Sequence, residues 1–297
     1  MRLTPRLTLL LTLPPLMWAG NAVLGRHVVG AISPVLLNGL RWALAFVLLV
    51  PLAGSLWKAP QALRQHWRYF ALLGLLGMGC YNAMLYAAVH SSSALNVTLI
   101  ASSMPAWMLA VGALKHGVRP RQPEIVGAVF SLVGVALVLG QGSWERLAAV
   151  HLVVGDLLML VAIVLWSIYS WMLVRPPFDR KPPWDWAGAL MAQCVFGAPW
   201  ALLFTGVEFA AGAAYVHWSL TVLLALAYVT IAASLIAYRC WGAGVAEAGP
   251  ATAAFFFNLT PLFAALLSLA LLGEGPAWYH GAAFALIVAG IAVSARR

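Results

Sequence analysis

The stretch Asn258-Leu259-Thr260-Pro261 lies in the middle of an apolar run that extends from Pro250 to Leu272. A similar stretch, Ser102-Ser103-Met104-Pro105, lies 156 residues earlier in the middle of a second apolar run, Leu95–Leu114. Each run is long enough to cross a bilayer as an α-helix. The sequence therefore predicts two membrane helices that a polar residue and a proline interrupt near the midplane.

The two prolines are expected to break the hydrogen bonding of their helices. A proline has no N–H group, so the carbonyl four residues before it, Ala101 or Phe257, loses its partner. A free carbonyl is costly in hydrocarbon, and it is tolerated where it faces protein or a water-filled cavity. We therefore expect Pro105 and Pro261 to mark a cavity and to act as hinges of the helices that gate it.

The composition is that of a membrane protein. Apolar residues make up 63% of the 297 residues and charged residues 8%, whereas a soluble domain is about 45–50% apolar and about 25% charged. The net charge is +9, but the basic residues fall in short loops, where they indicate topology and not nucleic-acid binding. The sequence predicts an all-α protein embedded in a lipid bilayer.

The apolar residues divide into ten segments that we expect to be membrane helices. They are Leu7–Gly25, Pro34–Ala53, Trp67–Val89, Leu95–Leu114, Pro123–Gly140, Val153–Val174, Trp186–Thr205, Trp218–Tyr238, Pro250–Leu272 and Ala277–Ser294. With the N-terminus inside, the outer side receives Arg26 and Arg146, Arg41 lies within a segment, and the other fourteen of the 17 Lys and Arg residues are cytoplasmic. This asymmetry predicts a multi-pass protein of the cell (inner) membrane with both termini in the cytoplasm.

The second half of the chain repeats the first. A shift of 156 residues matches Pro105 with Pro261, and the loop Gly117–Pro120 with the loop Gly273–Pro276. Five segments per half is an odd number, so residues 1–148 and 149–297 must insert in opposite directions. Inverted repeats are common in secondary transporters, whose substrate site lies at the midplane between the repeats. We therefore expect two inverted five-helix repeats around one cavity.

Several motifs resemble the EamA group of the drug/metabolite transporter superfamily, and within it the YddG-type exporters of aromatic and other amino acids. The motifs are Leu16–Asn21, Leu40–Trp42, Ala248–Ala254, Pro261, Leu272–Glu274, Gly281 and Ala289–Gly290. The resemblance covers nearly the whole chain and implies ten helices in two inverted halves with cytoplasmic termini. The first half departs from the pattern where Val118 stands at the position that corresponds to Glu274.

Aromatic and neutral polar residues within the predicted helices are the candidates for lining the cavity. They are Trp18, Asn21, Tyr81, Asn82, Tyr86, Ser102, Trp107, Trp166, Tyr169, Ser170, Tyr228, Tyr238 and Asn258. Each one taken singly is also consistent with helix packing. Together they offer ring faces and neutral hydrogen-bonding groups without an acid, which suits an amphipathic, zwitterionic or delocalised-cation substrate.

Charged residues are scarce inside the predicted helices. All eight acids lie in predicted loops or near segment ends, whereas proton-driven carriers place an ionisable group within the membrane. We therefore expect facilitated transport that is not driven through a membrane carboxylate. Arg41 allows two interpretations, of which we favour the second: it clamps a substrate carboxylate, or it bonds to backbone carbonyls inside the bundle. No spacing typical of a metal or cofactor site is present, and we expect neither.

The sequence predicts an exporter of amino acids, aromatic and other neutral ones, and of related small metabolites, which works by alternating access. The alternative is a proton-coupled multidrug or metabolite exporter of the same fold, with drug-like cations among its substrates. An intramembrane enzyme is not expected, because the chain has no His-Glu-x-x-His motif and no pair of membrane-embedded aspartates. A monomer and an oligomer both remain open.

Overall fold

The computed structural model describes residues 3–28, 30–92, 94–149, 153–272 and 277–295. Within these residues the secondary structure is helical, apart from one isolated β-bridge between Ile32 and Val216. The helices are α1 (Pro5–His27), α2 (Pro34–Leu52), α3 (Gly54–Lys58), α4 (Gln61–Gln65), α5 (Trp67–Gly74), the π-helix η1 (Leu75–Cys80), α6 (Tyr81–Ser91), α7 (Ala94–Ser102), α8 (Met104–His116), α9 (Gln122–Leu139), α10 (Trp144–Ala148), α11 (Val154–Val174), α12 (Trp186–Ala210), α13 (Leu220–Thr230), the π-helix η2 (Ile231–Ile236), α14 (Ala237–Ala248), α15 (Pro250–Phe257), α16 (Leu259–Leu272) and α17 (Trp278–Ser294).

The helices form a bundle that spans a membrane several times. Seven stretches of the described chain are long and apolar enough to cross a bilayer: Pro5–Gly25, Pro34–Leu52, Gln122–Leu139, Val154–Val174, Trp186–Ala210, Leu220–Ala248 and Pro250–Leu267. Helix α17 is apolar but shorter. The expected all-helical, multi-pass membrane fold is therefore confirmed, while the count of ten spans stays a prediction.

The largest error in the predicted boundaries concerns the eighth segment. The sequence predicts a helix over Trp218–Tyr238, whereas α13, η2 and α14 form one continuous run that extends to Ala248. Arg239 lies within this run, and its guanidinium carbon lies 4.6 Å from the ring centre of Trp186. The two π-helices, which widen the middle of such runs, have no counterpart among the predicted segments.

Helix boundaries repeat along the chain at the spacing found in the sequence. Shifted by 156 residues, η1 (Leu75–Cys80) coincides with η2 (Ile231–Ile236), and α9 begins and ends within one residue of α17. The single-residue break at Ser103, between α7 and α8, lies within one residue of the break at Asn258, between α15 and α16. The two halves of the chain therefore share their irregular features as well as their helices.

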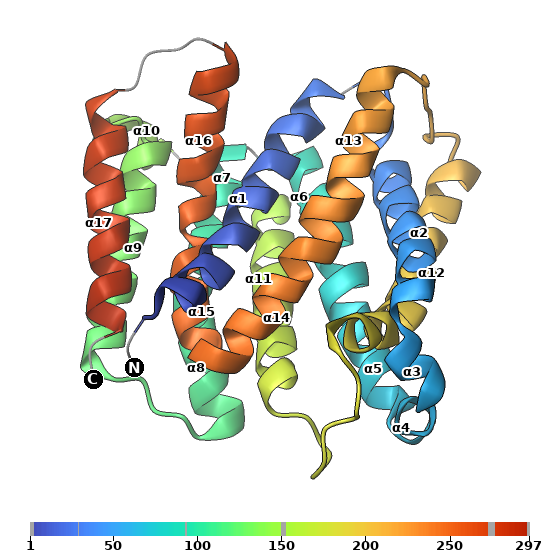
Figure 1. Cartoon of the computed structure of the whole chain (residues 1–297). Coiled ribbons are helices and arrows are strands. Elements are labelled where there is room, and N and C mark those ends of the chain that lie inside the picture. Colours follow the sequence, from blue (N-terminus) through green and yellow to red (C-terminus); the bar gives the residue numbers. More distant parts are fainter. Residues whose placement is uncertain (1–2, 29, 93, 150–152, 273–276, 296–297) are drawn as a thin grey trace.

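Figure 1 shows how the helices are arranged. Helices α9 and α17 lie side by side at one edge of the bundle, and α2 and α12 lie side by side at the other. Between them α1 packs against α14 and α16, and α11 packs against α6 and α8. The first residues of α1 and the last residues of α17 lie at the same end of the bundle (Figure 1).

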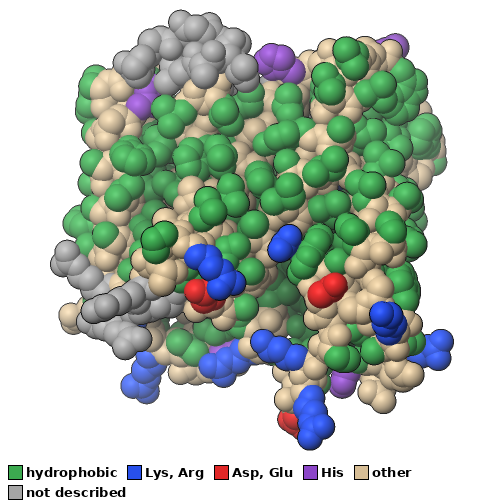
Figure 2. All heavy atoms as spheres, viewed as in Figure 1, with side chains coloured by type: hydrophobic (Ala, Val, Ile, Leu, Met, Phe, Trp, Pro, Cys, Tyr) green, Lys and Arg blue, Asp and Glu red, His purple; other side chains and the backbone are tan. Residues whose placement is uncertain are grey.

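The outer surface of the bundle is apolar. Figure 2 shows hydrophobic side chains over most of one face, with Lys and Arg gathered toward the end where α1 begins. Exposed aliphatic and aromatic side chains point outward from several long helices, among them Val47, Val133, Leu157, Leu203, Leu224 and Phe284. Such a surface is stable in contact with lipid chains, which agrees with membrane embedding.

Close contact between α9 and α17 depends on glycine. A Cβ atom on Gly290 would lie 2.6 Å from the Ser131 hydroxyl and 2.7 Å from the Gly127 carbonyl. Small residues of this kind let membrane helices approach at backbone distance. The same helix offers a matched comparison, because a Cβ atom on Gly281 would have nothing within 4 Å.

We expect Gly290→Ala to destabilise the protein by about 1–3 kcal/mol through overpacking. Gly281→Ala should be neutral or slightly stabilising, because alanine favours a helix by up to about 1 kcal/mol. Thermal unfolding of the two purified variants in detergent measures the difference. Equal melting temperatures would show that α9 and α17 can separate without cost.

Candidate functional site

Eight aromatic side chains pack together inside the bundle, and we call them the central aromatic cluster. They come from six helices in both halves of the chain. They are Trp18 of α1, Trp42 of α2, Tyr81 of α6, Trp166 and Tyr169 of α11, Tyr238 and Trp241 of α14, and Phe257 of α15. Most of these rings are almost completely buried.

Trp18 contacts several rings of the second half, and the pairs Trp42–Tyr238 and Tyr81–Trp166 also join the two halves. The ring centroid of Trp18 lies 5.6 Å from that of Trp166 and 5.6 Å from that of Trp241. It also lies 5.7 Å from Phe257 and 6.3 Å from Tyr238. Aromatic pairs at such distances contribute about 0.5–1.5 kcal/mol each beyond burial, so α1 is held against α11, α14 and α15 by several modest contacts.

The π-helix η2 presents a backbone carbonyl to this cluster. The N–H of Ala237 donates to the carbonyls of Ala232 and Ser234 and not to that of Ala233. The Ala233 oxygen instead accepts the indole N–H of Trp18 at 3.1 Å and Nη2 of Arg41 at 3.1 Å. Nε of Arg41 donates to the Ser234 hydroxyl at 2.5 Å. Side chains from α1 and α2 therefore satisfy the irregular backbone of η2.

A carbonyl of the first π-helix, η1, also accepts a side-chain hydrogen bond from the other half of the chain. The Tyr238 hydroxyl donates to the carbonyl of Gly77 at 2.5 Å, and Gly77 lies 156 residues before Ala233. A side chain at Gly77 is excluded, since its Cβ would lie 2.6 Å from the ring of Tyr169. The Tyr169 hydroxyl in turn donates to Oε1 of Gln193 at 2.9 Å. Each π-helix thus binds the other half of the chain through equivalent carbonyls.

The two helix breaks are satisfied locally by hydroxyl groups. Thr260 donates to the carbonyl of Phe257 at 2.7 Å, which is the carbonyl predicted to need a partner. In the first half the Ser103 hydroxyl donates to the carbonyl of Ile100 at 2.6 Å. The sequence predicted that the carbonyl of Ala101 would need a partner. The bonded carbonyl lies one residue earlier, and the helix ends in a turn at Ser103.

Several polar atoms in and beside the cluster have no partner among the described residues. Asn258 is fully buried, and neither Oδ1 nor Nδ2 forms a hydrogen bond. The indole nitrogens of Trp42 and Trp166 and the hydroxyl of Thr230 are also buried and unpartnered. Buried polar groups are nearly always hydrogen-bonded, and each exception costs about 1–3 kcal/mol. The cluster therefore holds donors and an acceptor that a guest molecule could satisfy.

The structure places six of the thirteen predicted cavity residues in or against the cluster. Trp18, Tyr81, Trp166, Tyr169 and Tyr238 belong to the cluster. Ser170 joins it by accepting the indole N–H of Trp241 at 3.2 Å, and Asn258 directly follows its member Phe257.

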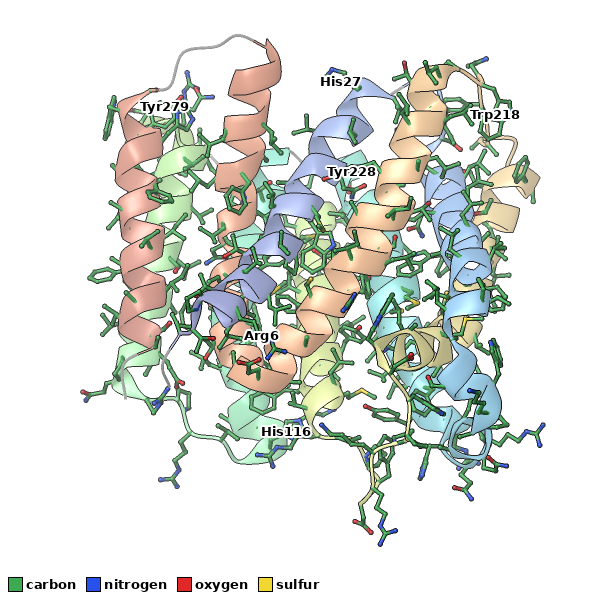
Figure 3. The ribbon with its side chains drawn as sticks, viewed as in Figure 1. Arg6, His27, His116, Trp218, Tyr228 and Tyr279 are labelled. Carbon is green, nitrogen blue, oxygen red and sulfur yellow. The ribbon has the colours of Figure 1, made fainter. Side chains whose placement is uncertain are left out.

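Other predicted residues serve the packing around the cluster. Tyr228 donates to the carbonyl of Met17 at 3.2 Å and lies between α1 and α13 (Figure 3). Asn82 bonds within its own run, to the carbonyl of Met78 at 3.4 Å. The remaining ones are Asn21, Ser102, Trp107, Pro105 and Pro261, of which Trp107 packs against the hydrophobic core. Ser102 and Pro105 are buried, whereas Asn21, Trp107 and Pro261 are half-buried. The side chain of Tyr86 and the whole of Glu274 lie outside the described part of the structure.

Four further contributors were not predicted: Trp42, Trp241, Phe257 and Gln193. Trp42 and Trp241 are fully buried, although Trp241 lies beyond the predicted end of its helix. A longer eighth segment would have placed it one turn after Tyr238, on the same face. Among the described residues, no three His, Cys, Asp or Glu side chains gather as metal ligands would.

We expect Tyr238→Phe to lower the stability of the protein by about 1–3 kcal/mol, because the Gly77 carbonyl would lose its side-chain donor inside the bundle. Tyr279→Phe, in the first turn of α17 at the end of the bundle opposite Arg6 (Figure 3), is the matched control and should change little. Thermal unfolding in detergent compares the two. A Tyr238→Phe protein as stable as the wild type would rule out a structural role for this bond.

Comparison with known proteins gives the family. The EamA-like transporter family matches residues 6–140 and again residues 153–296. An uncharacterized transporter of Archaeoglobus fulgidus is 27% identical over 289 residues, covering 95% of each chain. The aromatic amino acid exporter YddG of Ancylobacter novellus is 25% identical over 279 residues, covering 94% of this chain and 93% of its own.

A solved crystal structure supports the same fold. It covers 97% of this chain and 96% of its own, with a TM-score of 0.75 and 22% identity. The two family matches together span most of the sequence, one in each half. The chain therefore belongs to the EamA-like transporter family, and it is a multi-pass membrane transporter of small molecules and not an enzyme.

Proposed function

We propose that the protein exports aromatic and other neutral amino acids, and related small metabolites, across the cell inner membrane by alternating access. The observation that carries the proposal is the central aromatic cluster, in which buried polar atoms without partners lie among ring faces. Rings suit an apolar or aromatic side chain, and the unpartnered groups suit an amine and a carboxylate. The similarity to the YddG exporter of Ancylobacter novellus supports this substrate class.

The proposal includes two inverted five-helix repeats, residues 1–148 and 149–297, around the cluster. Three observations support it: the family matches each half separately, π-helices and helix breaks recur at a spacing of 156 residues, and the cluster draws on both halves. Alternating access then consists of one half rocking against the other around a midplane site.

Both termini are proposed to be cytoplasmic. Arg6 of α1 and His116 of α8 lie toward one end of the bundle, while His27, Trp218 and Tyr279 lie toward the other (Figure 3). The first residues of α1 and the last of α17 lie at the Arg6 end (Figure 1). Cytoplasmic loops carry the excess of Lys and Arg. The Lys and Arg side chains visible in Figure 2 gather toward the end of the bundle where α1 begins.

Transport is proposed to be facilitated. The buried charged side chains of the described chain are Arg41 and Asp156. Asp156 lies in the first turn of α11, where it accepts the Ser92 hydroxyl and, at 2.7 Å, the N–H of Val153. A carboxylate engaged at a helix end suits capping more than proton transfer at the midplane.

The test is uptake of labelled phenylalanine, methionine and threonine into proteoliposomes that contain the purified protein. We expect phenylalanine and at least one other amino acid to move down their gradients with no pH gradient present. If none of the three moves under any gradient, the amino-acid proposal fails. Flux that requires a pH gradient would favour the proton-coupled alternative.

The proposed hinges can be tested by removing their prolines. Pro105→Ala and Pro261→Ala should each lower phenylalanine flux about tenfold or more, because gating depends on helices broken at these points. Pro199→Ala is the matched control, since Pro199 lies exposed inside α12. Unchanged flux in both hinge variants, at wild-type expression, would show that the breaks are structural.

Trp166 offers a test of whether the cluster contacts the substrate. Trp166→Ala should reduce transport of phenylalanine more than that of threonine, because a large side chain depends more on ring contact than a small one. Trp278→Ala, at an exposed position of α17, should affect neither. An equal reduction for both amino acids would indicate a packing role for Trp166.

A further inference from the structure

Arg41 is a buried cation with no counter-ion among the described residues. Its side chain is 3% exposed, and it forms no ion pair with any carboxylate of the described residues. Placing an arginine near the centre of a membrane helix costs about 2.5–3.5 kcal/mol on insertion scales. Such residues usually face a cavity and mark a substrate or ion pathway.

The hydrogen bonds of Arg41 use one edge of its guanidinium. Nε donates to Ser234 and Nη2 donates to the carbonyl of Ala233, and these two nitrogens form one of the two bidentate edges of the planar group. Nη1 donates no hydrogen bond to the described residues. The second edge, formed by Nη1 and the remaining N–H of Nη2, matches the two oxygens of a carboxylate.

Satisfying the η2 backbone does not require this charge. The Ala233 carbonyl already accepts the neutral indole N–H of Trp18. At the equivalent carbonyl of the first half, Gly77, the donor is the neutral hydroxyl of Tyr238. A neutral donor thus serves in one half, whereas the other half adds a cation whose burial needs a further explanation.

Arg41 is also next to the central aromatic cluster. It shares the Ala233 oxygen with Trp18, a cluster ring that contacts the second half. Its guanidinium carbon lies 5.2 Å from the ring centre of Trp42, another cluster member. A carboxylate on the free edge of Arg41 would therefore belong to a molecule whose apolar part lies against the cluster.

We propose that the Nη1–Nη2 edge of Arg41 binds the carboxylate of the transported molecule, so that the site accepts zwitterions and carboxylic anions and rejects cations that lack a carboxylate. This rests on the proposed function of the cluster and names its substrate class. The carboxylate neutralises the buried guanidinium, while a cationic guest would add a like charge in a low-dielectric site. Drug-like amines are thereby excluded.

Three probes with the same ring separate the two charges of the substrate. Phenylalanine carries both, 3-phenylpropionate carries the carboxylate alone, and phenethylamine carries the ammonium alone. In proteoliposomes loaded with phenylalanine, excess 3-phenylpropionate should inhibit exchange of labelled phenylalanine at least about tenfold more strongly than phenethylamine does. Equal or stronger inhibition by phenethylamine overturns the inference.

Binding to the purified protein gives a second readout that does not depend on transport. Phenylalanine and 3-phenylpropionate should raise its melting temperature in detergent, and phenethylamine should not. Failure of all amino acids to move, together with this pattern, would reject the export proposal and keep the carboxylate site. Transport of phenylalanine without any stabilisation by 3-phenylpropionate would reject the carboxylate site alone.

Variants locate the effect. Arg41→Gln should weaken inhibition by 3-phenylpropionate about tenfold or more and remove its advantage over phenethylamine. Arg41→Lys keeps the charge without the fork and should retain part of the preference. Arg239→Gln, an exposed residue of α14, makes the same change in net charge and should leave the preference intact. An unaltered preference in folded Arg41→Gln overturns the assignment. If that variant does not fold, the wild-type probes still decide.

Discussion

The need to hydrogen-bond backbone carbonyls in a medium without water organises the interior of this protein. A π-helix changes the pattern of backbone bonds, and in a bilayer the resulting gap costs far more than it would at a wet surface. At η2 the Ala233 carbonyl is reached from α1 by Trp18 and from α2 by Arg41. At η1 the Gly77 carbonyl is reached from α14 by Tyr238. The irregular segments therefore become the places where the two halves are tied together.

These ties suit a carrier because they are few and replaceable. A single hydrogen bond contributes about 0.5–1.5 kcal/mol net, and an aromatic pair contributes a similar amount. A substrate that supplies ring faces and polar partners can compensate for the hydrogen bonds and ring pairs that break when the halves move. Asn258 shows the other side of this balance, because its buried amide has no partner in the described conformation. The proposed alternating access requires a small free-energy difference between conformations, which weak internal interactions and unsatisfied groups favour.

Much of this organisation could be predicted from the sequence. The end of the eighth helical run and the two π-helices could not. Hydropathy predicted the helical membrane fold, and the spacing of Pro105 and Pro261 predicted the spacing at which helix breaks and π-helices recur. The predicted boundary was wrong at Tyr238, because the helical run continues to Ala248, and Trp241 was therefore missing from the predicted site. The π-helices escaped prediction because Leu75–Cys80 and Ile231–Ile236 are apolar sequences without proline. Their geometry depends on distant partners, which local composition does not encode.

The two π-helices differ in the side chains that bond to their equivalent carbonyls. Two equivalent carbonyls face the centre, yet one is served by a neutral phenol and the other by an indole and a guanidinium. If a tyrosine served both carbonyls, the cluster would hold no net charge and would not distinguish between anionic, cationic and neutral substrates. In the proposed site, Arg41 orients a zwitterion with its carboxylate toward η2 and its ammonium toward the unpartnered groups and ring faces. In the proposed mechanism, the matching backbones of the two halves form the pathway, and their differing side chains select the substrate.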